Sequence, residues 1–502
     1  MGSTAAAMAD SSSIKSLLTD SLRVSTLEHE VNDDEDQAND VAESDAEQDV
    51  VDPIVERRLR MKIDLRLCTI AGVLCSLNLL DSGVISSASV TSMLSDLDLT
   101  GNRYSVSIFI FTIASIVFQL PSTFGVRAYG PRIWFSCATL AFGIITMCTA
   151  FIHRWQEMIA LRILLGMAMS GIYPGLTYLI STWYLRSEQQ TRFAFMQTGE
   201  VIILATGSIV NFGLNKLNGK GGLEGWRYMF LVQGLITCLI GIATYFWMVD
   251  FPDKAHNSIR FLSEDEQKLA VSRIERDRKD AQAEPFAWSK IFEHAKDLKV
   301  YGFACMFFLL NLVSTSLSYF LPIILQKGMG FSEDQSILLS APPYYYAVIP
   351  VILSSIVGDR LRLRGPVIIF NSLCLIAGFV MLGFADQVTV RYIGTYLATG
   401  AYVSNWAALS AYYSNNIVGH WKRAFTAAAV TAMNGAGGIA GSYIVRQQEA
   451  PRYATAVWIS IGSHVLLILF VLAFTVYFHV ANRKQLAGTA LLEGTKGFRY
   501  TF

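Results

Sequence analysis

The sequence predicts an all-α membrane protein with twelve transmembrane helices arranged in two six-helix bundles. The chain has 502 residues, of which 52% are hydrophobic and 16% charged, and its mean hydropathy is +0.39. Soluble domains are more polar than this. Twelve apolar runs follow one another, each near the ~20 residues that a helix needs to cross a bilayer. One long polar break, at residues 251–300, divides these runs into six and six, a pattern typical of two pseudo-symmetric bundles with a site between them.

The chain begins with a polar segment that we expect to be a disordered cytosolic tail. It is rich in Ser and Ala and then acidic, has no Lys or Arg between Arg23 and Arg57, and begins without an apolar signal region. Such a composition cannot bury enough apolar surface to become ordered. The expected organisation is a tail (1–62), an N-terminal bundle (63–250), a cytosolic middle loop (251–300), a C-terminal bundle (301–481) and a cytosolic C-terminal tail (482–502).

Hydropathy gives the expected membrane spans. They are 67–90, 105–125, 132–151, 157–179, 193–213, 227–249, 301–325, 337–357, 366–385, 390–413, 424–445 and 455–480.

The distribution of Lys and Arg predicts the orientation, because loops on the cytosolic side carry an excess of basic residues. Loops on the side of both termini carry nineteen Lys and Arg, ten of them in the middle loop, against nine on the other side. Both termini are therefore expected in the cytosol of a multi-pass plasma-membrane protein.

The middle loop carries a helix start signal. Ser263 is followed three residues later by Glu266, the spacing of a capping box. Leu269, Ile274 and interleaved charges then predict an amphipathic helix against the cytosolic face, which we interpret as a tether between the bundles.

Several function classes find no support in the sequence. Forty basic and forty acidic residues cancel, so the net charge does not favour a nucleic-acid partner. The seven cysteines lie in apolar runs without metal-ligand spacing, and we expect them to be packing residues. There is no nucleophile elbow or phosphate-binding loop, so we expect no enzyme activity, no cofactor and no metal site.

The stretch from Ala160 to Arg192 combines a buried charge with small residues. Arg162 lies in an apolar run, and Gly166 with Ser170, and Gly171 with Gly175, have the four-residue spacing that permits close helix approach. Pro174 follows near the far end, and the sequence becomes polar at Trp183-Tyr184-Leu185-Arg186-Ser187-Glu188.

This order of residues resembles the anion:cation symporter (allantoate permease) branch of the major facilitator superfamily. Matching motifs run from Arg57 to Tyr453, and the tail residues Phe498-Arg499-Tyr500 resemble a nicotinate-permease-like fungal subgroup. The other matches are Gly130-Pro131-Arg132, Gly225-Trp226-Arg227-Tyr228, Phe261-Leu262-Ser263-Glu264-Asp265-Glu266, Phe320-Leu321-Pro322, Pro342-Pro343-Tyr344, Asp359-Arg360 and Ser414-Asn415-Asn416-x-x-Gly419-x-x-Lys422-Arg423. The resemblance implies proton-linked uptake of a small organic anion or vitamin-like carboxylate.

The first helix departs from the family pattern. Ser82 stands where the family has an arginine, and Val84 and Ser87 replace two amides. Elsewhere Met169, Gln119 and Gln233 replace acidic residues. The binding site is therefore expected to be less polar than the family norm.

Asp81 and Arg162 are the first candidate site residues, because a charge inside the hydrocarbon core is costly and marks a functional position. At ~1.5 Å per residue, both lie roughly 21–22 Å from the cytosolic edge. A pair whose occupancy changes during transport and a static pair that joins two helices are both open readings.

Glu200 and Gln197, in Gln197-Thr198-Gly199-Glu200, form a second candidate site. An unpaired Glu200 would suit proton carriage, whereas an acid near the helix end could extend to water instead. His464, in the twelfth span, is expected to be a packing residue.

The second bundle supplies polar and aromatic candidates for substrate contact, although aromatic residues at helical spacing are more often packing residues. These are Asn311, Tyr319, Tyr344, Tyr345, Asn405 and Trp406. Asp359, Arg360 and Arg364 are expected to form a cytosolic gate, and four glycines from Gly435 to Gly441 predict a close helix contact.

The sequence thus predicts a secondary transporter of a small organic anion with protons as coupling ion. One alternative is an efflux transporter of a fungal secondary metabolite. Another is a nutrient receptor that does not transport, in which the acidic tail would signal.

Overall fold

The computed structural model describes residues 53–99, 101–184, 186–258, 261–279, 296–361, 363–418, 420–488, 492 and 498–502. The chain divides into two compact units, residues 1–62 and 63–502. The expected tail lies outside the described residues up to residue 52. Its last part, 53–62, belongs to helix α2 (Pro53–Ile63) and is helical where we expected disorder. Glu56 and Arg60, one turn apart, form an ion pair that supports this helix.

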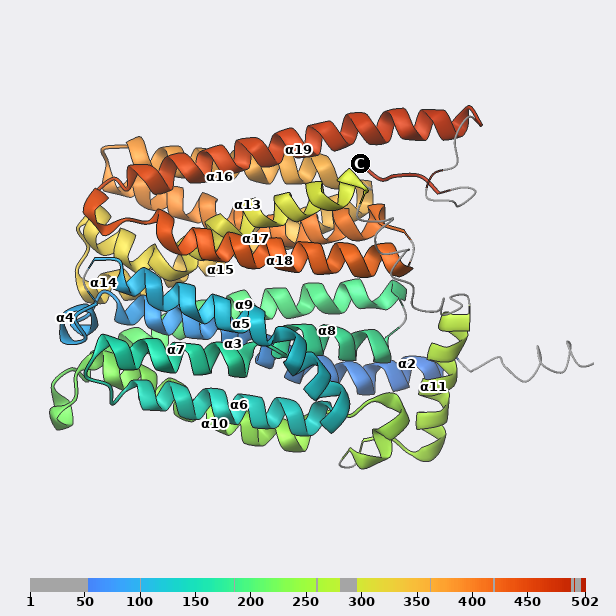
Figure 1. Ribbon diagram of the computed structural model, residues 1–502, viewed down its shortest axis with the longest axis horizontal. Coiled ribbons are helices and arrows are strands. Elements are labelled where there is room, and N and C mark those ends of the chain that lie inside the picture. Colours follow the sequence, from blue (N-terminus) through green and yellow to red (C-terminus); the bar gives the residue numbers. More distant parts are fainter. Residues whose placement is uncertain are drawn as a thin grey trace, which may run out of the picture. The chain divides into compact units, whose positions relative to one another are not determined.

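Helices carry almost all of the second unit (Figure 1). The first bundle contains η1 (Asp64–Cys68), α3 (Thr69–Ala88), α5 (Arg103–Tyr129), α6 (Pro131–Thr149), α7 (Trp155–Met169), α8 (Ile172–Trp183), α9 (Arg186–Asn215) and α10 (Gly225–Trp247). The second contains α13 (Leu298–Ile323), η4 (Ile324–Gly328), α15 (Ala341–Leu361), α16 (Arg364–Phe384), α17 (Val388–Asn416), α18 (His420–Ile444) and α19 (Ala454–Leu486). Short helices connect them: α4 (Met93–Asp96), η2 (Lys220–Gly222), η3 (Pro252–Asn257), α11 (Glu264–Lys279), α14 (Glu333–Leu338) and η5 (Gln447–Glu449).

These helices make twelve spans. Among the described residues, eight helical stretches are long and apolar enough to cross a membrane, and α5, bent by 50° before Pro121, is a ninth. The helices α9, α17 and α18, with 30, 29 and 25 residues, complete the twelve. Each predicted span overlaps one of them. The fourth span is broken between α7 and α8, at Ser170 and Gly171.

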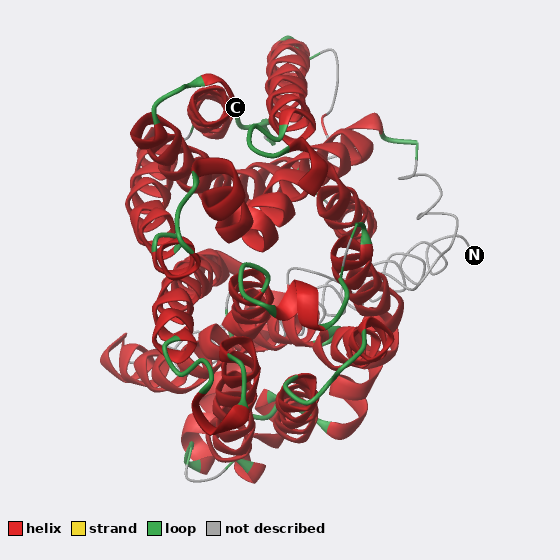
Figure 2. Ribbon diagram, turned by 90° about the vertical axis from the view of Figure 1, so that its left-hand side faces the viewer, coloured by secondary structure: helices red, strands yellow, loops and turns green. Residues whose placement is uncertain are grey.

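The same pattern of helix pairs occurs in both bundles. In the first, α3 packs on α9, α5 on α7 and α6 on α10; in the second, α13 packs on α18, α15 on α17 and α16 on α19. These are the first and fifth, second and fourth, and third and sixth spans of each half. Between the bundles, α5 meets α18 and α9 meets α15. The protein is therefore two repeated six-helix bundles, and in Figure 2 their helices are seen nearly end-on.

Two ends of this unit are named here by their short helices. The "α11 end" carries η1, α11 and the start of α13, and the "α14 end" carries α4, η2 and α14 (Figure 1).

Glycines set the helix spacing, as the sequence predicted. A Cβ on Gly166 would lie 2.5 Å from the carbonyl oxygen of Phe111, so α7 touches the backbone of α5. A Cβ on Gly437 would lie 2.3 Å from the carbonyl oxygen of Phe308, so α18 touches α13 in the same way. Only a residue without a side chain permits such contact.

The predicted capping box is confirmed at the start of α11. The hydroxyl of Ser263 accepts a hydrogen bond from the Glu266 N–H at 3.2 Å, and the Glu266 carboxylate accepts one from the Ser263 N–H at 3.0 Å. Ala270 and Ile274 are the buried residues of this helix. Arg273 pairs with Glu188 of α9, so α11 is attached to the first bundle.

Candidate functional site

Asp81 and Arg162 form a direct ion pair in the interior of the first bundle. Asp81 lies on α3 and Arg162 on α7, and Nη1 of Arg162 donates to Oδ2 of Asp81 at 2.6 Å. Each residue is only 1% exposed. The agreement of their depths, inferred from residue counts, corresponds to a real contact.

This ion pair uses only part of each group. Oδ1 of Asp81 and both Nε and Nη2 of Arg162 have no hydrogen-bond partner among the described residues. Nε and Nη2 lie on one edge of the guanidinium plane, and that edge can hold the two oxygens of a carboxylate side by side. Buried polar groups are normally satisfied, so this open edge is a candidate binding position.

The pair lies at the interface between the bundles. Tyr319, on α13 of the second bundle, is close enough to interact electrostatically with both charges. Its carbonyl oxygen accepts a hydrogen bond from the Tyr104 hydroxyl of α5 at 3.0 Å. The Phe111 ring lies 5.9 Å from the Arg162 guanidinium carbon. Residues from both bundles therefore lie around the open edge of Arg162.

Glu200 belongs to a separate cluster, nearer the α11 end. Its carboxylate is within hydrogen-bonding reach of the buried Cys75 thiol on α3. Cys75 precedes Asp81 by six residues, which is about 9 Å along the helix. Tyr173 of α8 interacts electrostatically with Glu200 and with Tyr413 of α17 in the second bundle.

Tyr173, which interacts with this cluster, is 54% exposed. Tyr173, Cys75 and Tyr413 were missed in the sequence, because aromatic and thiol side chains within apolar spans are usually packing residues.

The remaining candidates divide between the interface and the second bundle. Tyr345 reaches across the interface, where its hydroxyl lies 2.9 Å from that of Thr206 on α9. Asn311 donates to the carbonyl oxygen of Asn434 at 2.7 Å and so joins α13 to α18. Gln197 is half-buried on α9.

Three candidates point into the second bundle. Asn405 is fully buried and donates to the Ser372 hydroxyl of α16 at 3.1 Å. The Trp406 ring packs at 5.5 Å from that of Phe307, and Tyr344 is 3% exposed. Oδ1 of Asn405 has no hydrogen-bond partner among the described residues, and contact of these three residues with a substrate stays a prediction. His464 is also fully buried, within α19, as expected for a packing residue.

The expected gate of Asp359, Arg360 and Arg364 stays a prediction. The Asp359 side chain lies outside the described residues, and Arg360 is exposed. Arg364 begins α16 and is 7% exposed. At the same end, Asp297 instead accepts from Lys422 of α18 at 2.5 Å and from Lys299 at 3.4 Å.

Asp297 precedes the first turn of α13, outside the membrane spans, and has a shifted pKa. Burial alone would raise the pKa of this carboxyl. The hydrogen bonds from the Lys422 ammonium and the Lys299 N–H, together with both positive charges, outweigh burial and hold the pKa below its usual range.

Polar contacts join the two bundles at the α14 end. Asn215 of α9 donates to Glu333 at 2.8 Å and to Asp334 at 3.0 Å, both on α14. Lys216 pairs with Asp334 as well, and Gln326 donates to the carbonyl oxygen of Val90 at 2.9 Å. These contacts close the α14 end between the bundles.

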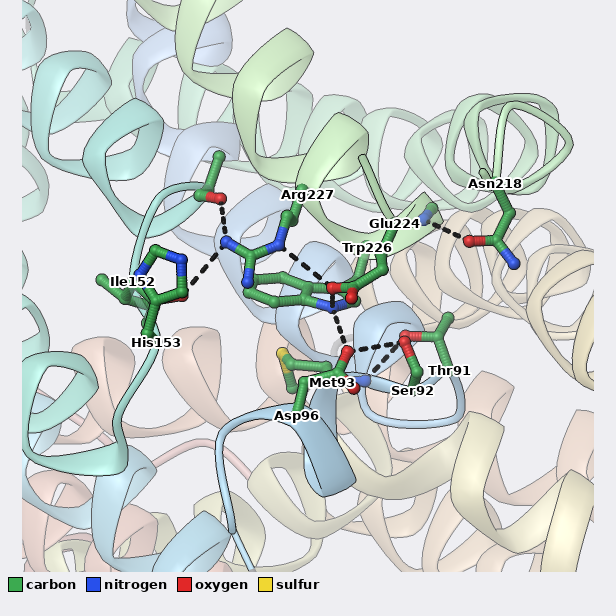
Figure 3. Close-up of polar contacts among 12 residues, drawn as sticks. Thr91, Ser92, Met93, Asp96, Ile152, His153, Asn218, Glu224, Trp226 and Arg227 are labelled. Atoms are coloured by element: carbon green, nitrogen blue, oxygen red, sulfur yellow. Dashed lines mark hydrogen bonds and ion pairs between the residues drawn. The ribbon is translucent and has the colours of Figure 1, made fainter. Parts of the chain in front are cut away.

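A second polar cluster braces the first bundle at this end (Figure 3). The Trp226 indole donates to Asp96 at 2.8 Å and to Glu224 at 2.9 Å. Arg227 donates to Glu224 at 3.0 Å and to the carbonyl oxygen of Ala150, at the end of α6, at 2.7 Å. The Gly225-Trp226-Arg227 motif is therefore structural: it ties α10 to α4 and α6.

Known proteins resemble this chain over most of its length. The family model described as Major Facilitator Superfamily matches residues 72–442. The high-affinity nicotinic acid transporter of Saccharomyces cerevisiae is 28% identical over 86% of this chain and 80% of its own. An uncharacterized transporter of Schizosaccharomyces pombe is 29% identical over 90% of this chain and 87% of its own.

Solved structures agree in fold. The xylose transporter XylE of Escherichia coli, in a partially occluded inward-open conformation, superposes with a TM-score of 0.65 at 15% identity, over 82% of this chain and 99% of its own. At that identity the likeness concerns the fold alone. With the family match over residues 72–442 and transporters as relatives over nearly the whole chain, this protein is a membrane transporter, not an enzyme, and belongs to the Major Facilitator Superfamily.

Proposed function

We propose that this protein carries a small organic anion of the vitamin-like carboxylate class into the cell together with protons, as a member of the allantoate permease branch. The observation that carries the proposal is the unpartnered Nε–Nη2 edge of the buried Arg162. A substrate carboxylate would dock there side by side with Asp81. The nicotinic acid transporter among the relatives supports an aromatic monocarboxylate as the first substrate to test.

Proton coupling follows from charge balance in a buried site. Asp81 and Arg162 neutralise each other when the site is empty. A substrate carboxylate adds a second negative charge, and an uncompensated buried charge is costly. A proton on Asp81, whose Oδ1 has no partner, restores neutrality. Glu200, nearer the α11 end, would receive that proton on its way to the cytosol.

The bundle arrangement supports alternating access. The α11 end carries the basic loops that the charge distribution assigns to the cytosol, so the α14 end faces outside. Its contacts between α9 and α14 then correspond to a transporter closed to the outside. Both termini lie in the cytosol and the membrane is the plasma membrane under this proposal.

Uptake in proteoliposomes tests the proposal. Radiolabelled nicotinate should accumulate when the outside is acidic and should not when a protonophore collapses the gradient. Arg162→Lys is the matched variant, because it keeps the charge but loses the side-by-side edge. We expect its KM to rise by ~10-fold or more, the loss of roughly one charge-assisted hydrogen bond.

Three results would contradict the proposal. Accumulation that does not depend on the pH gradient would contradict proton coupling. Saturable uptake of a neutral sugar in place of carboxylates would contradict an anionic substrate. Faster release from preloaded vesicles than uptake into empty ones, at matched gradients, would favour an efflux transporter.

A further inference from the structure

Residues 498–502 occupy a built site at the α11 end of the second bundle. Two asparagine side chains there bind peptide backbone in the manner of a neighbouring strand. Asn482 of α19 donates to the Tyr500 carbonyl oxygen and accepts from the Tyr500 N–H, both at 2.9 Å. Asn416 of α17 accepts from the Thr501 N–H at 2.8 Å and donates to its carbonyl oxygen at 3.1 Å.

Both asparagines are buried, at 9% and 0% exposure. A buried side-chain amide with its donor and its acceptor both turned to one residue's backbone is a peptide-recognition device. Such an amide binds an extended peptide backbone whatever side chains the peptide carries.

A side-chain pocket accompanies the backbone contacts. The Tyr500 ring, 4% exposed, stacks on Phe478 with centroids 4.5 Å apart and planes within 15°. The Lys299 ammonium donates to the Tyr500 hydroxyl at 2.5 Å and lies 4.6 Å from the ring centroid. An apolar face and a cation at the rim select a tyrosine from other aromatic residues.

Phe502, the last described residue, makes a further backbone contact at this site. The carbonyl oxygen of Phe502 accepts from the Arg364 N–H, in the first turn of α16, at 2.5 Å. Five residues thus contact the ends of four helices: α13, α16, α17 and α19.

We propose that this site is a peptide-binding groove whose ligand is the chain's own segment 498–502, held in cis as a releasable strap. The segment bridges Lys299, which begins α13, and Asn416, which ends α17. The same Lys299 contacts Asp297, the partner of Lys422 on α18. Seating the segment therefore fixes the α11 ends of the helices that carry Tyr319 and Tyr413, and releasing it frees them.

Binding of the segment in trans tests the proposal on the full chain. Tyr500→Ala vacates the pocket, and Thr501→Pro vacates the groove by removing the N–H that Asn416 accepts. A fluorescent peptide of residues 498–502 should bind to either purified variant. It should bind ~100-fold more weakly to the unaltered protein, whose tethered segment competes at an effective concentration in the mM range.

Matched peptides and a second readout complete the test. A peptide with Arg499→Ala should bind as the unaltered one does, because that side chain is exposed, whereas a Tyr500→Ala peptide should lose binding. Adding Asn482→Ala to the Tyr500→Ala protein should weaken the peptide by ~10-fold, as expected for two lost hydrogen bonds. Hydrogen exchange over residues 412–416 should rise in Tyr500→Ala and return when the peptide is added.

Each measurement has one result that supports the strap and one that contradicts it. Recovery of slow exchange by the peptide shows that the vacated protein is folded and that the groove is specific. Absence of peptide binding to both vacated variants, or equal binding to the unaltered protein, would overturn the strap. So would a peptide affinity that Arg499→Ala lowers as strongly as Tyr500→Ala does.

Discussion

At the scale of single residues, the buried Arg162 pairs with Asp81 and still leaves part of its guanidinium available for a substrate. One nitrogen is committed to Asp81, and two remain available at the interface with the second bundle. A fully satisfied guanidinium would only join two helices. The open edge favours the reading in which occupancy of the pair changes during transport.

Removing either charge of this pair should be severe, and removing both should be milder. Asp81→Asn or Arg162→Gln leaves one buried charge without compensation, at a cost of ~3–5 kcal/mol. The double variant should recover surface expression. Purely additive losses in thermal stability would show that the two residues are not coupled in the folded protein.

The transport readout of the same variants separates the two readings of the pair. If Asp81 carries the proton, uptake in the double variant should lack the pH dependence of the unaltered protein. If the pair is structural, the double variant should recover uptake with its pH dependence intact.

Asp297 should give the protein an acid-sensitive contact. Because the folded-state pKa of Asp297 is lowered, its ionisation stabilises the fold above the unfolded pKa of about 4 and ceases to do so as pH falls through the lower folded value. In melting experiments between about pH 3 and pH 7, Asp297→Asn should flatten the acid limb of the stability curve.

Lys422→Met is the companion variant for Asp297. It removes the ammonium whose hydrogen bond lowers the pKa of Asp297, so it should also flatten the acid limb of the stability curve. An unchanged acid limb in both variants would place the sensitive group elsewhere.

The sequence could place Asp81 and Arg162 at one depth, but it could not show which neighbours each side chain meets. Depth follows from counting residues along a helix, whereas the direction of a side chain depends on how each helix is rotated in the bundle. Asn405 is an example: the sequence made it a candidate for substrate contact, and in the structure its amide donates to Ser372.

At the scale of helices, α9 and α14 join the two bundles at the α14 end. Their contacts are one exposed ion pair, Lys216 with Asp334, worth ~0–1 kcal/mol, and two part-buried hydrogen bonds from the Asn215 amide. So few contacts would suit an element that separates and rejoins during transport. They could not be predicted from the sequence, since polar residues near helix ends have many possible partners.

A cross-link between these two helices should stop transport. The Asn215 amide nitrogen lies 2.8 Å from the Glu333 carboxylate, so cysteines at both positions should lie within reach of a short bifunctional methanethiosulfonate reagent. We expect uptake to fall to background with the cross-link formed and to return on reduction. Each single-cysteine variant is the control, and full transport through the cross-linked pair would show that the α14 end does not open at this point.

Helix ends differed from the sequence prediction more than helix positions did. Helix α9 begins at Arg186, whereas the predicted span began at residue 193, and α17 ends at Asn416, beyond the predicted residue 413. Polar turns continue the helix outside the apolar run, where hydropathy has no signal. The residues that matter there, Glu188 and Asn416, bind α11 and the segment 498–502.

At the scale of the whole molecule, orientation in the membrane decides which end is the entrance. Lys220 of η2 and Asp253 of η3 are both exposed, at the α14 and α11 ends respectively. In intact cells, a membrane-impermeant maleimide should label Lys220→Cys above the level of the parent protein and should leave Asp253→Cys unlabelled until the cells are opened. The reverse pattern would invert the topology.

The two bundles differ in where they place acidic residues. The first holds Asp81 and Glu200 within its spans. In the sequence of the second, the acids of residues 301–486 are Glu333, Asp334, Asp359, Asp386 and Glu449, all at or near helix ends. The acidic groups within the membrane spans thus lie in the first bundle, and the second bundle offers amides and aromatic rings.

Such a division would make the transporter modular in evolution. Substitutions at Asn311, Tyr319 or Tyr345 could change the substrate specificity without changing the acidic residues proposed for proton coupling, which lie in the other bundle. A lineage could then change the range of substrates that it transports through substitutions in one bundle only. Relatives with different cargoes would be expected to diverge along α13 and α15 and to keep their acids on α3 and α9.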